Sequence, residues 1–180
     1  AMLCGAAEFF TDDLGRARDY FSPWEATITD QPVFQRILGT NLAAVLELFN
    51  GKPQNANYQI ERLQDLPWSP EMAYPLCWCG WISGFAYLWE GQPVLAEEVL
   101  RRSLTSAESA SGRRSPISVM IAATLTAVLW ERELFDEAEM LLAGRLDMLE
   151  RLAPPDAIIH GYVTAARLAA VRGERGRAQD

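Results

Sequence analysis

The chain has 180 residues, of which 49% are hydrophobic and 22% are charged, and this composition is typical of an ordered globular domain. Its 16 Lys and Arg residues against 24 Asp and Glu residues give a net charge of −8, which repels nucleic-acid phosphates. We therefore do not expect this segment to bind DNA by itself. The longest uncharged stretch, residues 72–89, is interrupted by Pro75, Gly80 and Gly84, which favours a buried helix over a membrane span.

The chain contains three cysteines, an odd number, and its N-terminus lacks the charged-then-apolar pattern of a secretory signal. Reduced thiols are typical of the cytoplasm. We therefore expect a cytoplasmic protein with no membrane partner.

Apolar residues recur every three or four positions along nearly the whole chain, whereas strand signals are weak. In chain order, this periodicity predicts helices over 13–22, 32–50, 53–65, 71–90, 92–108, 116–132, 134–151 and 156–172, with a further helix from 174 onward. Pro32, Pro93, Pro116 and Pro155 lie at or near predicted helix starts, where a missing N–H costs little.

A pattern of three residues recurs along these helices. It consists of a small or short residue, a turn residue seven positions later, and an Ala five positions after that. The copies are Gly5–Asp12–Ala17, Ala44–Gly51–Ala56, Gly84–Gly91–Ala96, Thr126–Glu133–Ala138 and Ala166–Gly173–Ala178. Their first residues lie 39, 40, 42 and 40 positions apart. Small residues allow two antiparallel helices to approach closely, and the turn residue ends the first of them.

The sequence thus predicts a single all-α domain over residues 1–180, built from four to five helical hairpins of about 40 residues, of which the first and last are incomplete. Because an uncapped repeat array exposes apolar surface, we expect the segment to belong to a longer multi-domain protein.

The stretch GQPVLAEEVLRRSL, residues 91–104, resembles part of a tetratricopeptide repeat. The positions that match the signature of that repeat best are Gly84 and Tyr87, just before this stretch, and Ala96 within it. Its 40-residue unit is longer than usual, and most Trp and Pro signature residues are missing. The resemblance implies a right-handed α-solenoid.

Residues 75–180 also resemble the helical repeat region of LuxR-family, MalT-like ATP-dependent transcriptional regulators. The pieces that carry this resemblance are YLWEGQPVLAEEVLRRSL, GRRS, LFDEAE and PPDAIIHGY. It implies a signal-sensing, non-catalytic segment that binds a small-molecule inducer or a peptide or protein partner. ATP and DNA would be bound only by other domains, because this sequence contains neither a phosphate-binding GxxxxGK[ST] loop nor a basic recognition helix, and no cofactor is expected here. A tetratricopeptide-type interaction scaffold unrelated to transcription is the alternative.

If the hairpins stack as such repeats, the first helices line a concave groove. Positions six and three before each small residue, and one and four after it, should face that groove. The resulting candidate ligand-binding residues are Asn41, Trp78, Trp81, Phe85, Met120, Trp130, His160 and Arg167, with Leu38, Val45, Ala123 and Val163 beside them. They predict an apolar, aromatic groove in which Asn41, His160 or Arg167 orients the ligand. The same side chains would alternatively form packed core between the helices.

The sequence does not favour a catalytic or metal site. His160 is the only histidine, and Cys77 and Cys79 point to different faces of one helix, so zinc ligands do not converge. Apolar surroundings raise a thiol pKa, which favours a structural role for the cysteines. The arginines at 101, 102, 113 and 114 flank one loop, where they could hold an anion, face solvent or contact a neighbouring domain.

Overall fold

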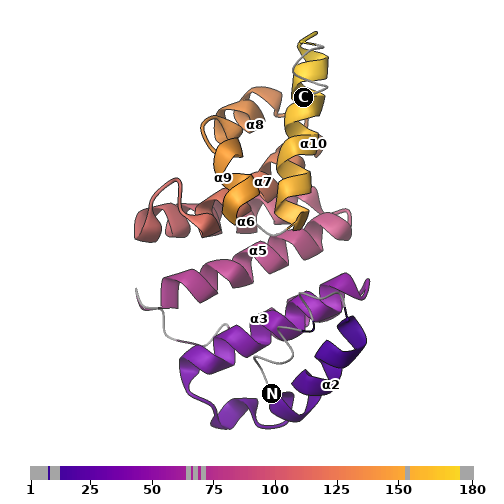
Figure 1. The fold of residues 1–180 in the computed structure, drawn as a ribbon, viewed down its shortest axis with the longest axis vertical. Helices are drawn as coiled ribbons and strands as arrows, with labels where there is room; N and C mark the ends of the chain where they lie inside the picture. Colours follow the sequence, from indigo (N-terminus) through magenta and orange to yellow (C-terminus); the bar gives the residue numbers. More distant parts are fainter. Residues whose placement is uncertain are drawn as a thin grey trace.

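The computed structural model describes residues 8, 13–63, 66, 69, 72–152 and 155–174 of the chain. These residues form helices and turns and no β-strand, so the all-α prediction is confirmed for the described part of the chain. The helices are α2 (Leu14–Glu25), η1 (Ile28–Asp30), α3 (Val33–Phe49), α4 (Pro53–Glu61), α5 (Ala73–Trp89), α6 (Pro93–Ser111), α7 (Pro116–Glu131), α8 (Phe135–Leu142), α9 (Leu146–Leu152) and α10 (Pro155–Val171). They follow one another along the long axis of the molecule, from α2 near one end to α10 at the other (Figure 1).

Proline and serine mark several helix starts. Proline occupies the first turn of α4, α6 and α7, where its missing N–H leaves no hydrogen bond unmade. At α7 the hydroxyl of Ser115 also accepts a hydrogen bond from the Ser118 backbone N–H, as an N-cap does.

The same turn ends α3, α5, α7 and α10. Its turn residue has a positive φ in each copy: 73° at Gly51, 71° at Gly91, 60° at Glu133 and 79° at Gly173. The following backbone N–H bonds back to the carbonyl five residues earlier, in the pairs 52 to 47, 92 to 87, 134 to 129 and 174 to 169. This hydrogen bond is the closing bond of the Schellman motif. Four of the five predicted turn positions therefore share one backbone geometry, and the fifth, Asp12, lies outside the described residues.

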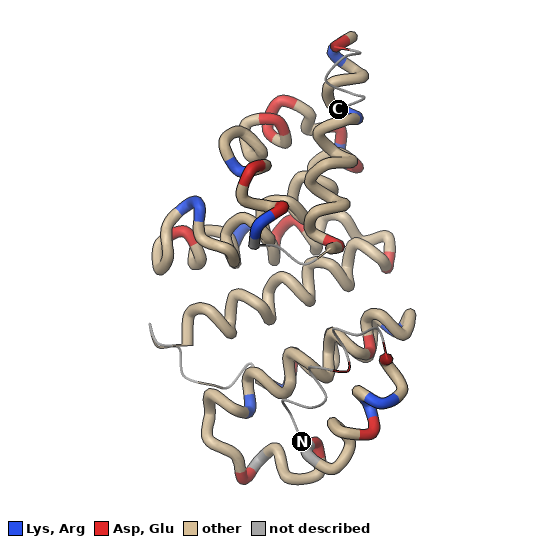
Figure 2. The backbone as a smooth tube through the Cα atoms, in the orientation of Figure 1, with Lys and Arg blue, Asp and Glu red and all other residues tan. Residues whose placement is uncertain are grey.

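Small residues lie where paired helices approach each other. Ala17, Ala56, Ala96 and Ala138 are fully buried. At Gly84 an added Cβ would lie 2.3 Å from the Cγ of Leu100, which shows how closely α5 approaches α6. The core is continuous from α3 to α10 and is rich in side chains of α5 and α7. Helix α5 contains no Lys, Arg, Asp or Glu, whereas charged residues are frequent in α2, α8 and α9 (Figure 2).

Several predicted boundaries change. The single helix predicted over 134–151 is wrong: the chain breaks after α8, where Gly144 has a φ of 70°, and resumes as α9. The guanidinium of Arg145 is buried at this bend, where it donates to the carbonyls of Leu141 and Arg113 and pairs with Glu108. The first copy of the repeat before residue 13 and the helix predicted from 174 onward lie essentially outside the described residues.

Candidate functional site

A cavity of about 550 Å³ opens between the C-terminal ends of α5 and α7 and one face of α10. Its lining residues are Leu88, Trp89, Gly91, Pro93, Ala127, Glu131, Ile159, His160, Val163, Thr164 and Arg167. The three helices are first helices of successive predicted hairpins. Leu88 and Ala127 occupy the positions four and one after Gly84 and Thr126 that the spacing rule selects.

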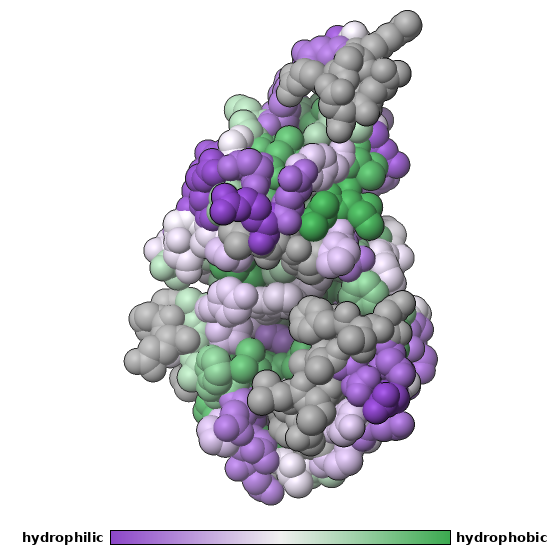
Figure 3. All heavy atoms as spheres, viewed as in Figure 1, coloured by the Kyte–Doolittle hydropathy of each residue, from purple (hydrophilic) through white to green (hydrophobic). Residues whose placement is uncertain are grey.

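The apolar part of the lining is open to solvent. The exposed fractions are 47% for Trp89, 59% for Ile159 and 41% for Val163, which are high values for such large hydrophobic side chains. Ile159 and Val163 are one helical turn apart on α10. Apolar side chains form a patch over the first half of α10, adjoining the end of α5 (Figure 3). An exposed apolar patch beside a cavity is typical of a binding surface.

His160 and Arg167 supply polar groups to the same cavity. The His160 ring lies edge-on against Phe85, with 5.0 Å between the ring centroids and 86° between the planes. Burial, and secondarily the charge of Arg167, lower the pKa of His160. The imidazole is therefore neutral at neutral pH and offers one N–H donor and one acceptor.

The guanidinium of Arg167 lies over the indole of Trp130, with its central carbon 5.7 Å from the ring centroid. This distance is within the range of cation–π contacts. Thr164 of α10 and the exposed Glu131 of α7 complete the polar lining.

Four of the predicted groove residues are instead buried in the helix packing. Trp81 is 2% exposed, and its indole N–H donates to Thr124 Oγ1 on α7 at 2.8 Å. Phe85 is 1% exposed and Met120 is 2% exposed. Asn41 is buried, with its Nδ2 donating to the Pro75 carbonyl at 2.8 Å. In this structure these side chains contribute to the core.

The structure thus divides the predicted set. His160 and Arg167 lie in the cavity, with Phe85 and Trp130 in contact with them from α5 and α7. Trp78 is half-buried and lies edge-on to Trp81, at 5.3 Å between centroids, and does not line the cavity.

The spacing rule does not select six of the residues that line the cavity, namely Trp89, Gly91, Pro93, Glu131, Ile159 and Thr164. Trp89 and Glu131 lie five positions after the small residue of their unit, next to the turn. A rule extended by one position toward the turn would have found these two.

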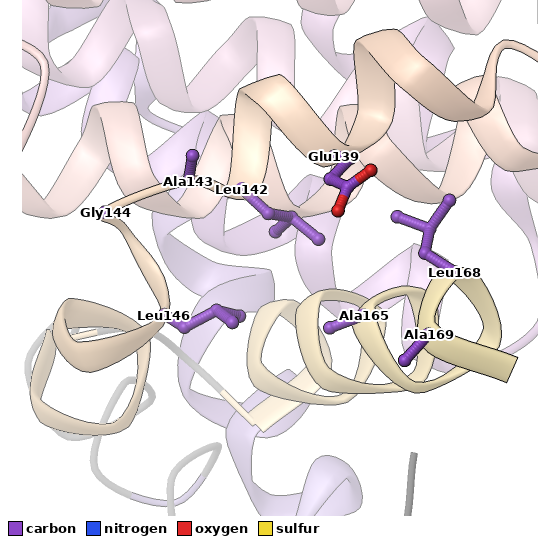
Figure 4. A pocket seen from close by; sticks show the side chains of 8 residues that line it. All are labelled: Glu139, Leu142, Ala143, Gly144, Leu146, Ala165, Leu168 and Ala169. Carbon is purple, nitrogen blue, oxygen red and sulfur yellow. The ribbon is translucent and has the colours of Figure 1, made fainter. Parts of the chain in front are cut away.

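A second, smaller groove of about 250 Å³ lies between α8, the start of α9 and α10 (Figure 4). Leu142 and Leu146 face Ala165, Leu168 and Ala169 across it. Its one charged lining residue, Glu139, pairs with Arg172. None of the predicted groove residues lies here, so we regard the cavity at α10 as the better candidate site.

The basic loop contacts the neighbouring hairpin. Arg113 donates to the carbonyls of Met140 and Ala143, and Arg114 donates to the carbonyl of Gly144 and the carboxylate of Asp147. These carbonyls lie at the C-terminal end of α8, where a positive charge is favourable. Both guanidinium groups are engaged in contacts within the protein.

The two cysteines in α5 are buried, and burial shifts the pKa of their thiols. It raises the pKa of Cys77, and it raises the pKa of Cys79 to about 12. The Cys79 thiol also donates a hydrogen bond to Asn41 Oδ1 at 3.0 Å. Cys4 lies outside the described residues. A thiol with a raised pKa is a poor nucleophile near neutral pH.

Within the described ranges, no group of three or more His, Cys, Asp or Glu side chains is arranged to hold a metal ion. Nor is any helix of these ranges both long enough and apolar enough to cross a bilayer. No family model matches the chain, and no curated protein sequence matches it.

Proposed function

We propose that this chain is a non-catalytic binding module, and that the cavity between α5, α7 and α10 binds a small organic molecule with an apolar body. The observation that carries the proposal is the combination, in one cavity, of exposed apolar side chains with His160 and Arg167. The volume of about 550 Å³ is within the usual range of ligand sites, about 300–1,000 Å³.

We further propose that the hairpins form a tetratricopeptide-like right-handed solenoid with the cavity on its concave side. The recurrent turn geometry supports a repeat, because Gly51, Gly91, Glu133 and Gly173 share a positive φ and the same closing hydrogen bond. Alanine at the same position of each second helix supports the same register.

The resemblance to LuxR-family, MalT-like regulators extends this proposal to a signal-sensing role. In that role the bound molecule is an inducer, and ATP and DNA bind to other domains of the regulator. The extension rests on the pieces of residues 75–180 that carry the resemblance.

The contacts of α10 suggest how binding affects the rest of the chain. His160 contacts Phe85 of α5, and Arg167 contacts Trp130 of α7. A ligand between these helices changes the free energy of one packing arrangement relative to others, which is the requirement for allosteric coupling.

A peptide ligand is the second candidate. Trp89, Ile159 and Val163 are exposed large hydrophobic residues around one cavity, and an amphipathic peptide helix would bury them. A peptide-binding module of this kind would be an interaction scaffold unrelated to transcription.

The uncharged fluorophore N-phenyl-1-naphthylamine tests whether the cavity binds apolar molecules. We expect its fluorescence to rise on titration with the protein, and Ile159→Asp to weaken binding at least tenfold, because a carboxylate replaces an apolar wall. Tyr58→Asp is the matched control, since Tyr58 is 64% exposed on α4 and does not line the cavity. Equal binding by both variants, or none by the parent protein, would contradict the proposal.

A panel of small metabolites and a panel of amphipathic peptides, both measured by thermal shift, then separate the two candidates. A metabolite that raises the melting temperature of the parent protein but not of Ile159→Asp supports the inducer-binding function. Stabilisation by peptides alone supports the scaffold.

A further inference from the structure

The ion pairing of Arg167 indicates which class of ligand the cavity binds. Several other described arginines pair with carboxylates: Arg101 and Arg132 both pair with Glu97, and Arg172 pairs with Asp136. Arg167 forms no ion pair with any described carboxylate. A guanidinium that lines a cavity and is not paired with a carboxylate is available to an anionic ligand.

The guanidinium of Arg167 lies against an aromatic ring. Trp130 lies beneath it at 5.7 Å, and Trp130 is itself packed against Phe135 with 4.8 Å between the ring centroids. Stacking on an aromatic face leaves the N–H groups at the edge of the guanidinium available for hydrogen bonds in its plane. That planar edge matches the two oxygens of a carboxylate.

The neighbouring groups fit an acid with an apolar body. Val163 lies one helical turn from Arg167, and Trp89 and Ile159 extend the apolar lining. His160 is neutral at neutral pH, so it adds an N–H donor without a second positive charge.

Glu131 is the one acidic residue that lines the cavity. The side chains of Glu131 and Arg167 are both exposed, so water and salt screen both charges. Glu131 opposes binding of an anion only through its charge, whereas Arg167 can also donate hydrogen bonds to the anion.

We propose that the ligand of this cavity is an apolar organic acid whose anionic group binds to Arg167, while its hydrocarbon or aromatic part packs against Trp89, Ile159 and Val163. This inference rests on the proposed binding function of the cavity and names the chemical class of its ligand.

Two fluorophores that differ by one charged group test the inference. N-phenyl-1-naphthylamine is neutral, whereas 1-anilinonaphthalene-8-sulfonate has the same ring system and carries a sulfonate in place of the carboxylate. We expect the parent protein to bind the sulfonate at least fivefold more tightly at low ionic strength, since a charge-assisted hydrogen bond is added. Arg167→Gln should abolish this preference, because it weakens binding of the sulfonate far more than binding of the neutral probe.

Arg16→Gln is the matched control, because Arg16 is an exposed arginine on α2, at the opposite end of the molecule from α10 (Figure 1). It should retain the full preference for the sulfonate. Glu131→Gln should strengthen binding of the sulfonate and not of the neutral probe. Circular dichroism establishes that each variant is folded.

The outcomes separate the two proposals. If neither probe binds, the proposed function fails. Another outcome is that the neutral probe binds, with an affinity that Ile159→Asp lowers, while the sulfonate binds no more tightly than the neutral probe. In that case the proposed function stands and the inference about the acid is overturned. Retention of the preference in Arg167→Gln, or its loss in Arg16→Gln, also overturns the inference.

Discussion

His160 is the residue of the cavity whose protonation changes nearest to neutral pH. It packs against Phe85, and the charged residues in its cavity are Arg167 on α10 and Glu131 on α7. Burial, followed by the charge of Arg167, lowers its pKa from the ordinary value of about 6.5. The folded protein therefore binds a proton on His160 less readily than the unfolded chain does.

This difference predicts how stability depends on pH. As the pH falls below about 6.5, the unfolded chain takes up a proton at residue 160 before the folded protein does, so this contribution to stability is lost; it is present in full above that pH. We expect His160→Gln to lose less stability than the parent protein between pH 7.5 and 5.5. The measurement is urea unfolding at both pH values. An equal loss in the two proteins would contradict the shifted pKa.

The turn residues allow a second prediction, based on backbone conformation. Glu133 has a φ of 60°, a conformation that costs a non-glycine residue about 1–2 kcal/mol. Glu133→Gly should stabilise the protein by about 0.5–1 kcal/mol, because relief of strain exceeds the added flexibility of the unfolded chain.

Gly91→Ala should destabilise the protein by about 1 kcal/mol. An added Cβ meets no atom within 4 Å, so the cost comes from the strained backbone alone. Changes of the opposite sign in chemical unfolding would contradict this interpretation.

At the scale of the helices, one buried and one exposed arginine form ion pairs at the bend between α8 and α9. Arg145 is buried and pairs with Glu108, whereas Arg114 is exposed and pairs with Asp147 at 2.5 Å. Burial lowers the pKa of Arg145, which reflects the cost of moving its charge out of water. The two contacts therefore differ in their contribution to stability.

Removal of each arginine should show this difference. Arg145→Ala leaves a buried gap and removes the partner of Glu108 and the donors to two carbonyls, so we expect a loss of about 3 kcal/mol. Arg114→Ala should cost less than about 1 kcal/mol, because exposed ion pairs contribute little. Thermal and urea unfolding compare the two variants, and similar losses would refute the distinction.

At the scale of the whole molecule, α7 joins the helices on either side of it. It accepts the hydrogen bond from the Trp81 indole of α5 at Thr124, and its Trp130 lies beneath Arg167 of α10. A change at Trp81 therefore affects packing across several hairpins. Trp81→Ala should cost about 3–5 kcal/mol in urea unfolding.

The Trp81–Thr124 hydrogen bond can be tested with a smaller change. Thr124→Val keeps the shape of the side chain but leaves a buried indole N–H without its acceptor, so we expect a loss of about 1–3 kcal/mol in urea unfolding. Thr105→Val is the control, because that hydroxyl is exposed and bonds to the Arg101 carbonyl in its own helix. Its effect should stay within about 0.5 kcal/mol. Comparable effects of the two substitutions would exclude an interhelical role for the hydrogen bond.

Local features account for what the sequence predicted well. Helical periodicity, proline at helix starts and the spaced turn residues act over one or two helical turns, and the structure has the predicted turn conformation at Gly51, Gly91, Glu133 and Gly173. The single helix over 134–151 was wrong because the bend depends on Arg145, whose partners Arg113 and Glu108 lie more than 30 positions away. Periodicity within a segment contains no information about such distant contacts.

The sequence by itself therefore determined the all-α class, the turn positions and the small residues at close helix approaches, because each follows from backbone conformation or side-chain size at a fixed spacing. Only the tertiary structure decided which groove candidates are core. Trp81 and Phe85 are buried, whereas His160 and Arg167 line a cavity with Trp89, a residue that the spacing rule did not select. The physical reason is that exposure on a first helix depends on how α10 packs against α5 and α7, and this packing is set by contacts between hairpins that are remote in sequence.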